Sequence, residues 1–485
     1  MKKYVKPRHF DRNLIIIGAG SAGLVSAYLG AALRAKVTLI EKNEMGGDCL
    51  NTGCVPSKAL IRSAKILALA KRAETFGFNR MEVDFDFARI MDRIQRIIKT
   101  IAPHDSVERY TKLGVECIQG EAKITTPNSV EVNGLTLTAR NIIIATGSNP
   151  TLPSIPGIEQ VGYLTTDTIW DIRALPKRLV VLGGGPVGCE LSQCFSRFGS
   201  NVTLVEMQPR IMYREDPDVS DIITGKFMEE GIKVMTNHRV ISFSYSNNSK
   251  NMVCMHEGEQ NSIEFDELLV ASGRKPATVG FGLEELGIPL LNSGGIKTDR
   301  YLQTVYPSIY ACGDVTGSYQ FTHMAAHQAW FAVFNCLFGG LKKLKADMSI
   351  VPWATFTEPE VARVGLNETE AAARKLPCET TRYSINELDR AIVDDESCGI
   401  VKVLTVPGKD QILGATIVGE HAGELIGEFI SAMRHGLGLN RILSTIHIYP
   451  TMAEANKYTA GLWRRHHTPE ILLRLIERFH SWRRG

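Results

Sequence analysis

The sequence has no long hydrophobic run, no marked excess of either charge and no dense set of cysteines. Of its 485 residues, 44% are hydrophobic and 22% are charged, and the net charge is +3. These values are typical of a soluble globular chain long enough for three or four domains. Because the body of the chain has no basic run, there is no electrostatic case for nucleic acid as a partner.

Segments that could act as targeting or membrane sequences are also lacking. The apolar run at Leu14 to Ile17 is too short for the core of a signal peptide, and it leads directly into a glycine motif. The stretch from Met324 to Leu337 contains His327, Gln328 and Asn335, so it falls short of a spanning helix. The sequence therefore predicts no transmembrane segment.

Ten cysteines are scattered along the chain, unlike the dense framework of a small secreted protein. Two pairs share a spacing of five positions, Cys49 with Cys54 and Cys189 with Cys194. Residues five apart in a helix have Cα atoms about 8.6 Å apart, and a disulfide needs them within about 6.8 Å. The second pair follows a glycine motif that opens a helix, so it cannot bridge.

The first pair lies in the stretch 46–58, GGDCLNTGCVPSK, where glycines and a proline allow a distorted backbone. We therefore interpret Cys49 and Cys54 as a redox disulfide, with Cys49 outside regular helix. A helix starting at about Ser57 would place Cys54 near a positive helix N-terminus, which stabilises a thiolate. A single catalytic disulfide of this kind fits a cytoplasmic protein.

A glycine motif, GAGSAG at 18–23, follows a buried strand at 13–17 and opens a helix. The next strand, 36–40, ends at Glu41, about 20 residues after the first glycine, where an acid can bind ribose hydroxyls. Strand, helix and acid at these offsets predict a dinucleotide-binding βαβ unit. The strand 141–144 also leads into a motif, Ala-Thr-Gly, that suits contact with a nucleotide.

A second βαβ unit has the strand 179–182, the motif GGGPVG at 183–188 and a strand 201–205 that ends at Glu206. A carboxylate there accepts hydrogen bonds from a free 2′-hydroxyl and repels a 2′-phosphate, so NADH is favoured over NADPH. Arg210 could accommodate a phosphate, but no cluster of arginines surrounds it. Nicotinamide transfers hydride poorly to a disulfide, so a flavin is expected between them.

In this combination and order, the motifs resemble those of the FAD-containing pyridine nucleotide-disulfide oxidoreductases, the family of dihydrolipoyl dehydrogenase, glutathione reductase and mercuric reductase. The resemblance covers residues 11 to 462. It rests on the redox motif, both glycine motifs, Ala-Thr-Gly at 145–147, ASGRKP at 271–276 and IYACGD at 309–314.

The resemblance implies an α/β fold with two Rossmann-like domains, one for FAD and one for NAD, and an α+β C-terminal dimerisation domain in a homodimer. The expected domains are 1–150 (FAD, first part), 151–276 (NAD), 277–346 (FAD or central, second part), 347–465 (dimerisation) and 466–485 (a basic amphipathic helix). The implied cofactor-binding residues are Gly18, Gly20, Gly23, Glu41, Gly47, Asp48, Ala145, Thr146, Gly147, Gly183, Gly185, Gly188, Glu206, Gly273, Gly313 and Asp314.

The family mechanism implies a role for each residue of the redox site. Hydride passes from NADH to the flavin, and electrons pass on to the disulfide. Cys49 is then the thiol that exchanges with substrate, and Cys54 is the thiolate against the flavin. Lys58 favours that anion, and Glu190 supplies the countercharge that a buried ammonium needs. No metal site is expected.

The substrate side departs from the pattern of dihydrolipoyl dehydrogenase and glutathione reductase. Tyr449 stands where those enzymes have a His before Pro, while Glu454 keeps the place of their Glu. A phenol with a pKa near about 10 is a donor at neutral pH, whereas imidazole titrates near about 6.5. His447 could substitute as the base, since it shares a face with Tyr449 in an extended segment, but it lies roughly 7 Å along that segment.

Tyr449 resembles the corresponding residue of mercuric reductase, but the vicinal cysteine pair at the end of that enzyme and its N-terminal metal-binding domain are missing here. Asp48 is a second departure, because better-known members have Thr there. The last segment predicts a helix from Thr468 as N-cap to Trp482 with an apolar stripe and a basic remainder. We expect it to pack within the dimer rather than on a membrane surface or an acidic partner.

Three functions follow from these observations. The first is an NADH-linked dithiol/disulfide oxidoreductase of the dihydrolipoyl dehydrogenase type, acting on a small dithiol that a lipoyl protein could carry. The second is a mercuric or other metal-ion reductase that uses the same cysteines. The third is a redox-sensing or scaffold flavoprotein subunit with low turnover.

Overall fold

The computed structural model describes residues 6–485 and divides into two compact units. The first unit contains residues 6–71, 80–207 and 238–347, and the second contains residues 72–79, 208–237 and 348–485. The domain boundaries expected from the sequence stay predictions, and the first five residues of the expected domain 1–150 lie outside the described residues.

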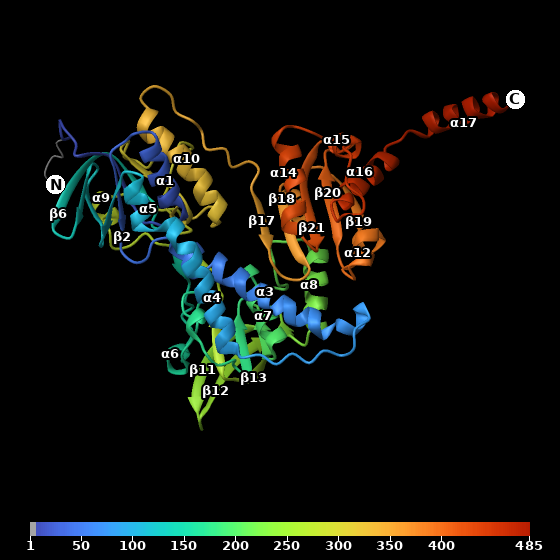
Figure 1. The fold of residues 1–485 in the computed structure, drawn as a ribbon, viewed down its shortest axis with the longest axis horizontal. Helices are drawn as coiled ribbons and strands as arrows, with labels where there is room; N and C mark the ends of the chain where they lie inside the picture. Colours follow the sequence, from blue (N-terminus) through green and yellow to red (C-terminus); the bar gives the residue numbers. More distant parts are fainter. Residues whose placement is uncertain (1–5) are drawn as a thin grey trace. The chain divides into compact units, whose positions relative to one another are not determined.

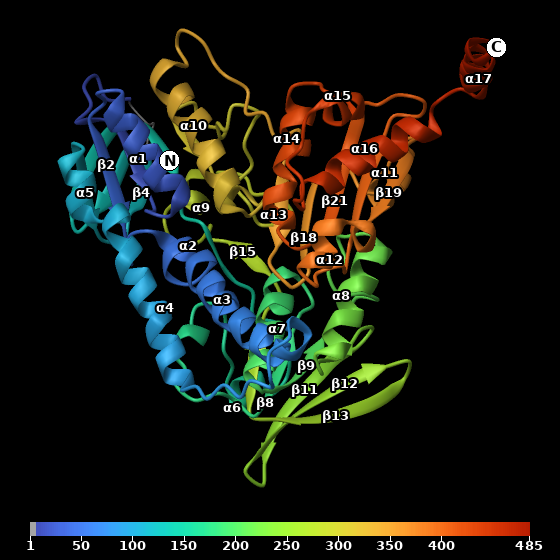
Figure 2. The same ribbon diagram turned by 45° about the vertical axis from the view of Figure 1, so that its right-hand side comes forward.

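The first unit contains a seven-stranded mixed sheet, in whose parallel part β1 (Arg12–Ile17) lies between β2 (Val37–Glu41) and β6 (Leu135–Ile144). β3 (Val115–Gln119) extends the sheet beyond β2, and β16 (Ile309–Ala311) pairs with β6. Leu14, Ile15 and Ile16 are fully buried, because a parallel sheet is covered on both faces. α1 (Ser21–Ala32) and α10 (Thr322–Phe338) pack side by side (Figure 2).

A second parallel sheet in the same unit has β8 (Arg178–Leu182) between β9 (Asn201–Val205) and β14 (Glu267–Val270). α7 (Pro186–Phe198) follows β8 and ends at Gly199, whose φ of 108° is left-handed. Both predicted βαβ units are therefore present. The other strands of the first unit, which lie outside this second sheet, are β4 (Lys123–Thr126), β5 (Ser129–Val132), β7 (Ser148–Pro150), β11 (Arg239–Ser246), β12 (Ser249–His256), β13 (Glu259–Phe265) and β15 (Arg274–Pro276).

The remaining helices of the first unit can be followed by their labels and colours in Figure 1. They are α2 (Gly47–Asn51), α3 (Cys54–Lys71), α4 (Phe87–Ile101), α5 (Val107–Lys112), α6 (Ile158–Val161) and α9 (Leu283–Leu286). Short 3-10 turns are present at Ala102–Asp105, Ile169–Asp171 and Asp314–Thr316.

The second unit is built on an antiparallel five-stranded sheet. Its strands lie in the order β17 (Pro352–Thr355), β18 (Glu360–Gly365), β21 (Ile412–Gly419), β20 (Ile400–Thr405) and β19 (Glu379–Ser384). Ala415, Ile417, Val401 and Phe429 are fully buried in its core. The other elements are Ala73–Phe76, α8 (Pro217–Glu229), β10 (Lys233–Met235), α11 (Glu368–Ala373), Ile385–Glu387, α12 (Asp389–Val393), α13 (Ala422–Leu425), α14 (Gly427–Arg434), α15 (Leu439–Ser444), α16 (Glu454–His466) and α17 (Glu470–Arg484).

Two local expectations are wrong. Cys49 lies inside a helix, the short α2. The helical conformation is interrupted between the two cysteines, at Thr52 and Gly53, rather than before them. Thr468 is not the N-cap of the last helix, because its hydroxyl donates to the Arg464 carbonyl at 2.8 Å and Pro469 takes the N-cap place. The helix itself is present, as α17. Across residues 6–485, we find no helix with the length and apolar character needed to span a bilayer.

Candidate active site

The redox motif folds into the short helix α2 and the start of α3, and the junction between these two helices brings the two thiols together. Gly53 lies at this junction, where a Cβ atom would come 2.8 Å from the Asp48 carbonyl oxygen. Gly47 has a φ of 57°, and a Cβ there would come 2.7 Å from the Cα of Gly20. The redox motif and the first glycine motif therefore touch through glycines. Cys49 and Cys54 are free thiols that share a hydrogen bond.

The two thiols of this pair have opposite acidities. The hydrogen bond from Cys49 is the main cause that lowers the pKa of Cys54 to about 6, against burial, with further help from the Thr322 hydroxyl and the Lys58 charge. The same hydrogen bond, together with burial, raises the pKa of Cys49. At neutral pH, Cys54 is therefore the thiolate and Cys49 the thiol. Sequence reasoning missed Thr322, whose Oγ1 lies 3.5 Å from the Cys54 sulfur at the start of α10.

An ion pair connects α3 to α7 close to this sulfur. Lys58 Nζ lies 2.9 Å from Glu190 Oε2, and the Glu190 side chain is only 6% exposed. The two residues come from two different predicted motifs that are far apart in the sequence. The structure thus contains the pair that the family resemblance implied, while its role stays a proposal.

The first glycine motif is shaped for a tightly approaching dinucleotide. A Cβ at Gly18 would come 2.4 Å from the Ala145 carbonyl oxygen, and one at Gly23 would come 1.8 Å from the Gly18 carbonyl oxygen. The Glu41 carboxylate accepts the Ala19 amide at 2.6 Å, so the acid lies directly beside the turn. These features fit FAD, which would be held by Gly18, Gly20, Gly23 and Glu41.

The second glycine motif repeats this construction almost atom for atom. A Cβ at Gly183 would come 2.5 Å from the Ala271 carbonyl oxygen, and one at Gly188 would come 1.9 Å from the Gly183 carbonyl oxygen. The Glu206 carboxylate accepts the Gly184 amide at 2.6 Å. The residues therefore fit NAD, with Gly185 open to the ligand side and Gly273 following β14 on the neighbouring strand.

Asp48, which sequence reasoning could not explain, forms an ion pair with Arg274. The Arg274 guanidinium also donates to the hydroxyl and the carbonyl of Ser148, each at 2.8 Å. The Ser148 hydroxyl in turn donates to Asp314 Oδ2 at 2.8 Å. Burial raises the pKa of both carboxyl groups above the ordinary value, and the Ser148 hydroxyl, for Asp314, and the charge of Arg274, for both, offset only part of that rise. This network connects the redox motif with Asp314, and Arg274 and Ser148 are site residues that the motifs alone did not single out.

The other predicted cofactor residues line the same region. Ala145, Thr146 and Gly147 directly follow β6, and the Thr146 hydroxyl donates to the Ala277 carbonyl at 2.8 Å. The Gly313 amide donates to the Gln328 side chain at 2.7 Å, which fixes the start of the Asp314 turn.

The predicted substrate-side residues belong to the second unit. Tyr449 is 64% exposed and donates to Asp389 Oδ2 at 3.0 Å. That hydrogen bond raises the pKa of Tyr449, so the phenol is a donor at neutral pH. His447 faces away from this role: its Nε2 lies 3.1 Å from Glu428 Oε1, and its Nδ1 lies 3.0 Å from the Thr445 carbonyl oxygen.

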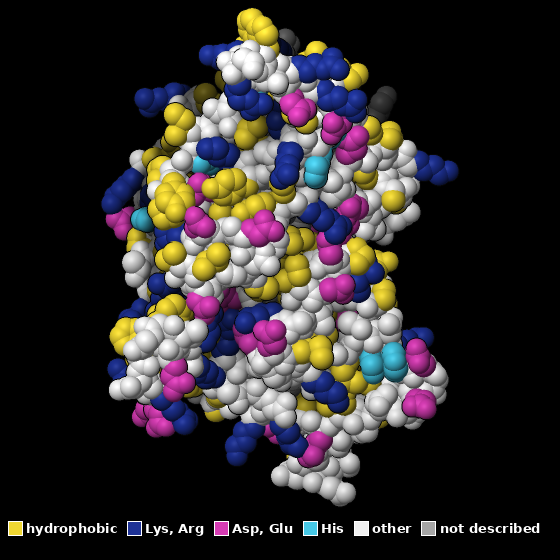
Figure 3. Space-filling model, turned by 90° about the vertical axis from the view of Figure 1, so that its right-hand side faces the viewer, with side chains coloured by type: hydrophobic (Ala, Val, Ile, Leu, Met, Phe, Trp, Pro, Cys, Tyr) yellow, Lys and Arg dark blue, Asp and Glu magenta, His cyan; other side chains and the backbone are white. Residues whose placement is uncertain are grey.

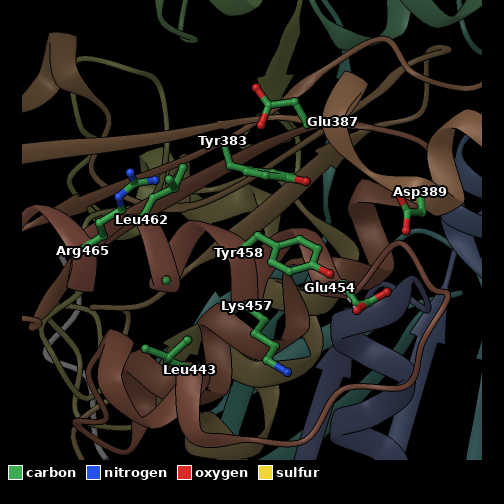
Figure 4. A pocket seen from close by; sticks show the side chains of 10 residues that line it. Tyr383, Glu387, Asp389, Leu443, Glu454, Lys457, Tyr458, Leu462 and Arg465 are labelled. Carbon is green, nitrogen blue, oxygen red and sulfur yellow. Dashed lines mark hydrogen bonds between the residues drawn. The ribbon is translucent and has the colours of Figure 1, made fainter. Parts of the chain in front are cut away.

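Glu454 does not orient Tyr449 within the chain. It accepts a hydrogen bond from the Tyr458 hydroxyl at 3.2 Å, and Asp389 takes the place beside Tyr449 instead. Figure 4 shows Glu454, Tyr458 and Asp389 on the wall of one cleft. Tyr383, Glu387, Lys457 and Arg465 complete the polar part of that wall.

Three carboxylates in the second unit have the spacing of metal ligands but surround a lysine. Lys402 Nζ lies 2.7 Å from Asp216, 2.8 Å from Asp218 and 2.8 Å from Glu368. The lysine, whose side chain is fully buried, supplies the positive charge of this cluster. We assign the cluster to the packing of the second unit.

Comparison with known proteins agrees with this site. Residues 12–329 match the pyridine nucleotide-disulphide oxidoreductase family, and residues 351–460 match its dimerisation domain. The chain is 36% identical to a mercuric reductase of Bacillus cereus over 93% of its own length and 71% of the relative. It is 34% identical to a dihydrolipoyl dehydrogenase of Chlamydia muridarum over 91% and 94% of the two chains.

Solved structures show the same fold. The HOCl-induced flavoprotein disulfide reductase RclA from Escherichia coli superimposes with a TM-score of 0.82 at 29% identity, over 93% of this chain and 99% of that one. LpdA from Mycobacterium tuberculosis superimposes with a TM-score of 0.84 at 26% identity, over 93% and 99%. With its two glycine cradles and its paired thiols, the chain belongs to the pyridine nucleotide-disulphide oxidoreductase family.

Proposed function

We propose that the chain is an NADH-linked dithiol/disulfide oxidoreductase of the dihydrolipoyl dehydrogenase type, acting on a small lipoyl-like substrate. The observation that carries the proposal is the division of the hydrogen-bonded pair into a thiolate, Cys54, and a thiol, Cys49. Bound FAD would supply the two-electron relay between nicotinamide and these sulfurs. The Cys49 thiol, the Thr322 hydroxyl and the Lys58 charge stabilise the negative charge of Cys54.

In the direction of disulfide reduction, Cys49 loses its proton and attacks one substrate sulfur, which breaks the substrate S–S bond and releases one thiolate. The proton lost by Cys49 neutralises that thiolate. Cys54 then attacks the Cys49 sulfur, forms the Cys49–Cys54 disulfide and releases the second thiolate. The pair loses two electrons and the substrate gains two.

A homodimer completes the site in this proposal, supported by the match of residues 351–460 to the family's dimerisation domain. The partner subunit's Tyr449 then faces Cys49 and relays the proton, taking up the one that Cys49 loses as it gives its own to the leaving sulfur. The hydrogen bond to Asp389 raises the pKa of Tyr449, so the phenol is protonated at neutral pH. A protonated group at this place suits disulfide reduction better than dithiol oxidation. Asp389, rather than Glu454 or His447, orients it.

The choice of nicotinamide follows from Glu206. Its carboxylate is fixed at the Gly184 amide, where it would accept ribose hydroxyls and repel a 2′-phosphate. We propose NADH as the reductant and the cytoplasm as the location, since a reduced thiol pair of this kind works in a reducing compartment. Steady-state kinetics with NADH and NADPH test the first point: a higher kcat/KM for NADPH would contradict it.

Turnover with alternative substrates tests the proposed reaction. Lipoamide and glutathione disulfide with NADH, and dihydrolipoamide with NAD, are compared under the same conditions. We expect measurable turnover with the lipoyl substrates and little with glutathione disulfide. Turnover with Hg(II) and none with lipoyl substrates would replace the proposal by the second candidate.

That second candidate is a metal-ion reductase. Two observations favour it: Tyr449 stands in the place of the imidazole, and relatives of this chain are mercuric reductases. RclA has also been solved as a Cu(II) complex. Hg(II) and Cu(II) are therefore the metal ions to assay, with NADH oxidation as the readout and the double variant Cys49→Ser/Cys54→Ser as the control for non-enzymatic reduction.

A further inference from the structure

The helix α17 carries an apolar face that no part of the described chain covers. All its residues, 470–484, are exposed, and Ile471 and Trp482 are 72% and 76% exposed. At 100° per residue, six of its seven large apolar side chains fall within an arc of about 140°, and Leu473 lies outside it. The six are Ile471, Leu472, Leu475, Ile476, Phe479 and Trp482.

Basic side chains border this face. Arg474 and Arg478 lie one turn apart along one edge, and Arg483 and Arg484 end the helix. Against these four arginines the helix carries two acids, Glu470 and Glu477, both on the far side of the wheel. In Figure 3, dark blue side chains stand next to yellow ones over the upper part of the surface.

We propose that α17 binds the surface of an anionic lipid bilayer, lying parallel to it with the apolar face in the headgroup region. Large apolar and aromatic side chains on one face and arginines at its edges are the composition of interfacial helices. Trp482 and Phe479 would enter at the level of the headgroups. The stems of Arg474 and Arg478 would lie along the apolar surface while their guanidinium groups reach lipid phosphates.

The charge of α17 favours an anionic bilayer surface over a second copy of the chain as the partner of its apolar face. Two α17 helices packed face to face would bring their arginine-lined edges together, whereas an anionic surface neutralises them. The helix dipole accounts for Arg483 and Arg484 in the last turn, but not for Arg474 and Arg478 in the middle of the helix. An anionic surface would neutralise the charge of these two arginines.

Vesicle flotation of the FAD-loaded full chain tests the proposal. We expect binding to vesicles of phosphatidylcholine with 30% phosphatidylglycerol, weak binding to pure phosphatidylcholine, and loss of binding as salt rises. Arg474→Gln/Arg478→Gln should weaken partitioning about 25-fold, since each arginine near an anionic surface contributes roughly a factor of five. Leu475→Ser/Phe479→Ser should abolish it.

The matched control is Arg89→Gln/Arg96→Gln, which removes two exposed arginines from the amphipathic α4 and should leave binding unchanged. NADH oxidation in solution should be the same in all variants, which shows that they fold. Equal binding to neutral and anionic vesicles, or to neither, would overturn the proposal. The proposal would also be overturned if light scattering showed that Leu475→Ser/Phe479→Ser changes the protein from a dimer to a monomer, because α17 would then bind a second copy of the chain. Binding to soluble polyglutamate without binding to vesicles would overturn it as well.

Discussion

At the scale of single residues, the site depends on how its side chains stabilise the negative charge of the Cys54 sulfur. Cys54 has several stabilising neighbours, and Thr322 is the one that offers a simple deletion, because its hydroxyl donates from the first turn of α10. The thiolate exists above the pKa of about 6 and the thiol below it. The pH profile of Cys54 reactivity therefore reports directly on these contacts.

We predict that Thr322→Val raises the pKa of Cys54 by roughly one unit, the size expected for one hydrogen bond to a charged group. The alkylation rate of Cys54 by iodoacetamide, followed by mass spectrometry in the reduced protein, should rise through pH 6 in the native chain and at higher pH in the variant. Thr100→Val removes an exposed helix hydroxyl elsewhere and serves as the control. Identical profiles for all three proteins would contradict the prediction.

Tyr449 offers a test of the proton donor. Tyr449→His should raise dithiol oxidation with NAD, because imidazole accepts a proton near neutral pH. Tyr449→Phe should lower disulfide reduction by about 10²-fold, the lower limit for losing a general acid. Both are measured as kcat against pH. If Tyr449→His loses activity in both directions, the phenol has a function that an imidazole cannot supply.

Arg274 tests the network around Asp48. Arg274→Met should remove the ion-pair partner of Asp48 and the donor to Ser148, which in turn holds Asp314, and should weaken FAD retention by about tenfold. Flavin fluorescence released on dilution is the readout. The control is Arg173→Met, which breaks an exposed pair with Asp92, so it should have little effect. Equal FAD release from the two variants would contradict the assigned role.

Several of these residues could be predicted from the sequence, and others could not. The glycines, Glu41, Glu206 and the two cysteines stand at fixed offsets within motifs, so local spacing identifies them. Thr322, Ser148 and Asp389 act through contacts made between segments far apart in the chain, and no local spacing marks them. Arg274 stands within the ASGRKP motif at 271–276, but only the fold shows that its partners are Asp48 and Ser148.

At the scale of elements, the break between α2 and α3 and the packing around Lys402 are the main findings. The sequence placed Cys49 outside helix on a sound distance argument, but the chain satisfies that distance by ending one helix and starting another at Gly53. The cluster on Lys402 joins α8, α11 and β20, which come from separate parts of the sequence. Sequence spacing gave no sign of it.

We predict that Lys402→Met destabilises the second unit by about 3–5 kcal/mol, because it leaves the buried Asp216 carboxylate without its counterion. Burial raises the pKa of Asp216 and of Glu368, but the hydrogen bonds from Lys402 and threonines outweigh it and lower both. In the native chain, stability from these groups is present above their unfolded pKa values and is lost as pH falls through the folded ones.

The variant should respond to acid in the opposite direction. Without the lysine, burial raises the carboxyl pKa values, so protonation at low pH removes the uncompensated negative charge. The difference in the free energy of unfolding between the native chain and the variant therefore becomes smaller as pH falls. Urea unfolding at pH 7.5 and pH 5 measures this gap. Arg382→Met, which removes a half-exposed partner of the same acids, is the control. A gap that widens in acid would contradict the account.

At the scale of the whole molecule, the predicted family, the fold class with two Rossmann-like domains and a dimerisation domain, and the cofactors FAD and NAD are confirmed. These followed from motifs that stand in a fixed order along most of the chain. The identity of the substrate did not follow, because it depends on Tyr449 and its neighbours, where the relatives themselves divide between mercuric reductases and dihydrolipoyl dehydrogenases.

An anaerobic titration of the FAD-loaded full chain with NADH tests the central claim most directly, namely that Cys49 and Cys54 form the redox pair with Cys54 as the thiolate. We predict a long-wavelength charge-transfer band after one equivalent of NADH at pH 7.5, its loss as pH falls through about 6, its loss in Cys54→Ser and its persistence in Cys49→Ser. A flavin that is reduced directly with no such band would contradict the claim and favour a low-turnover flavoprotein subunit.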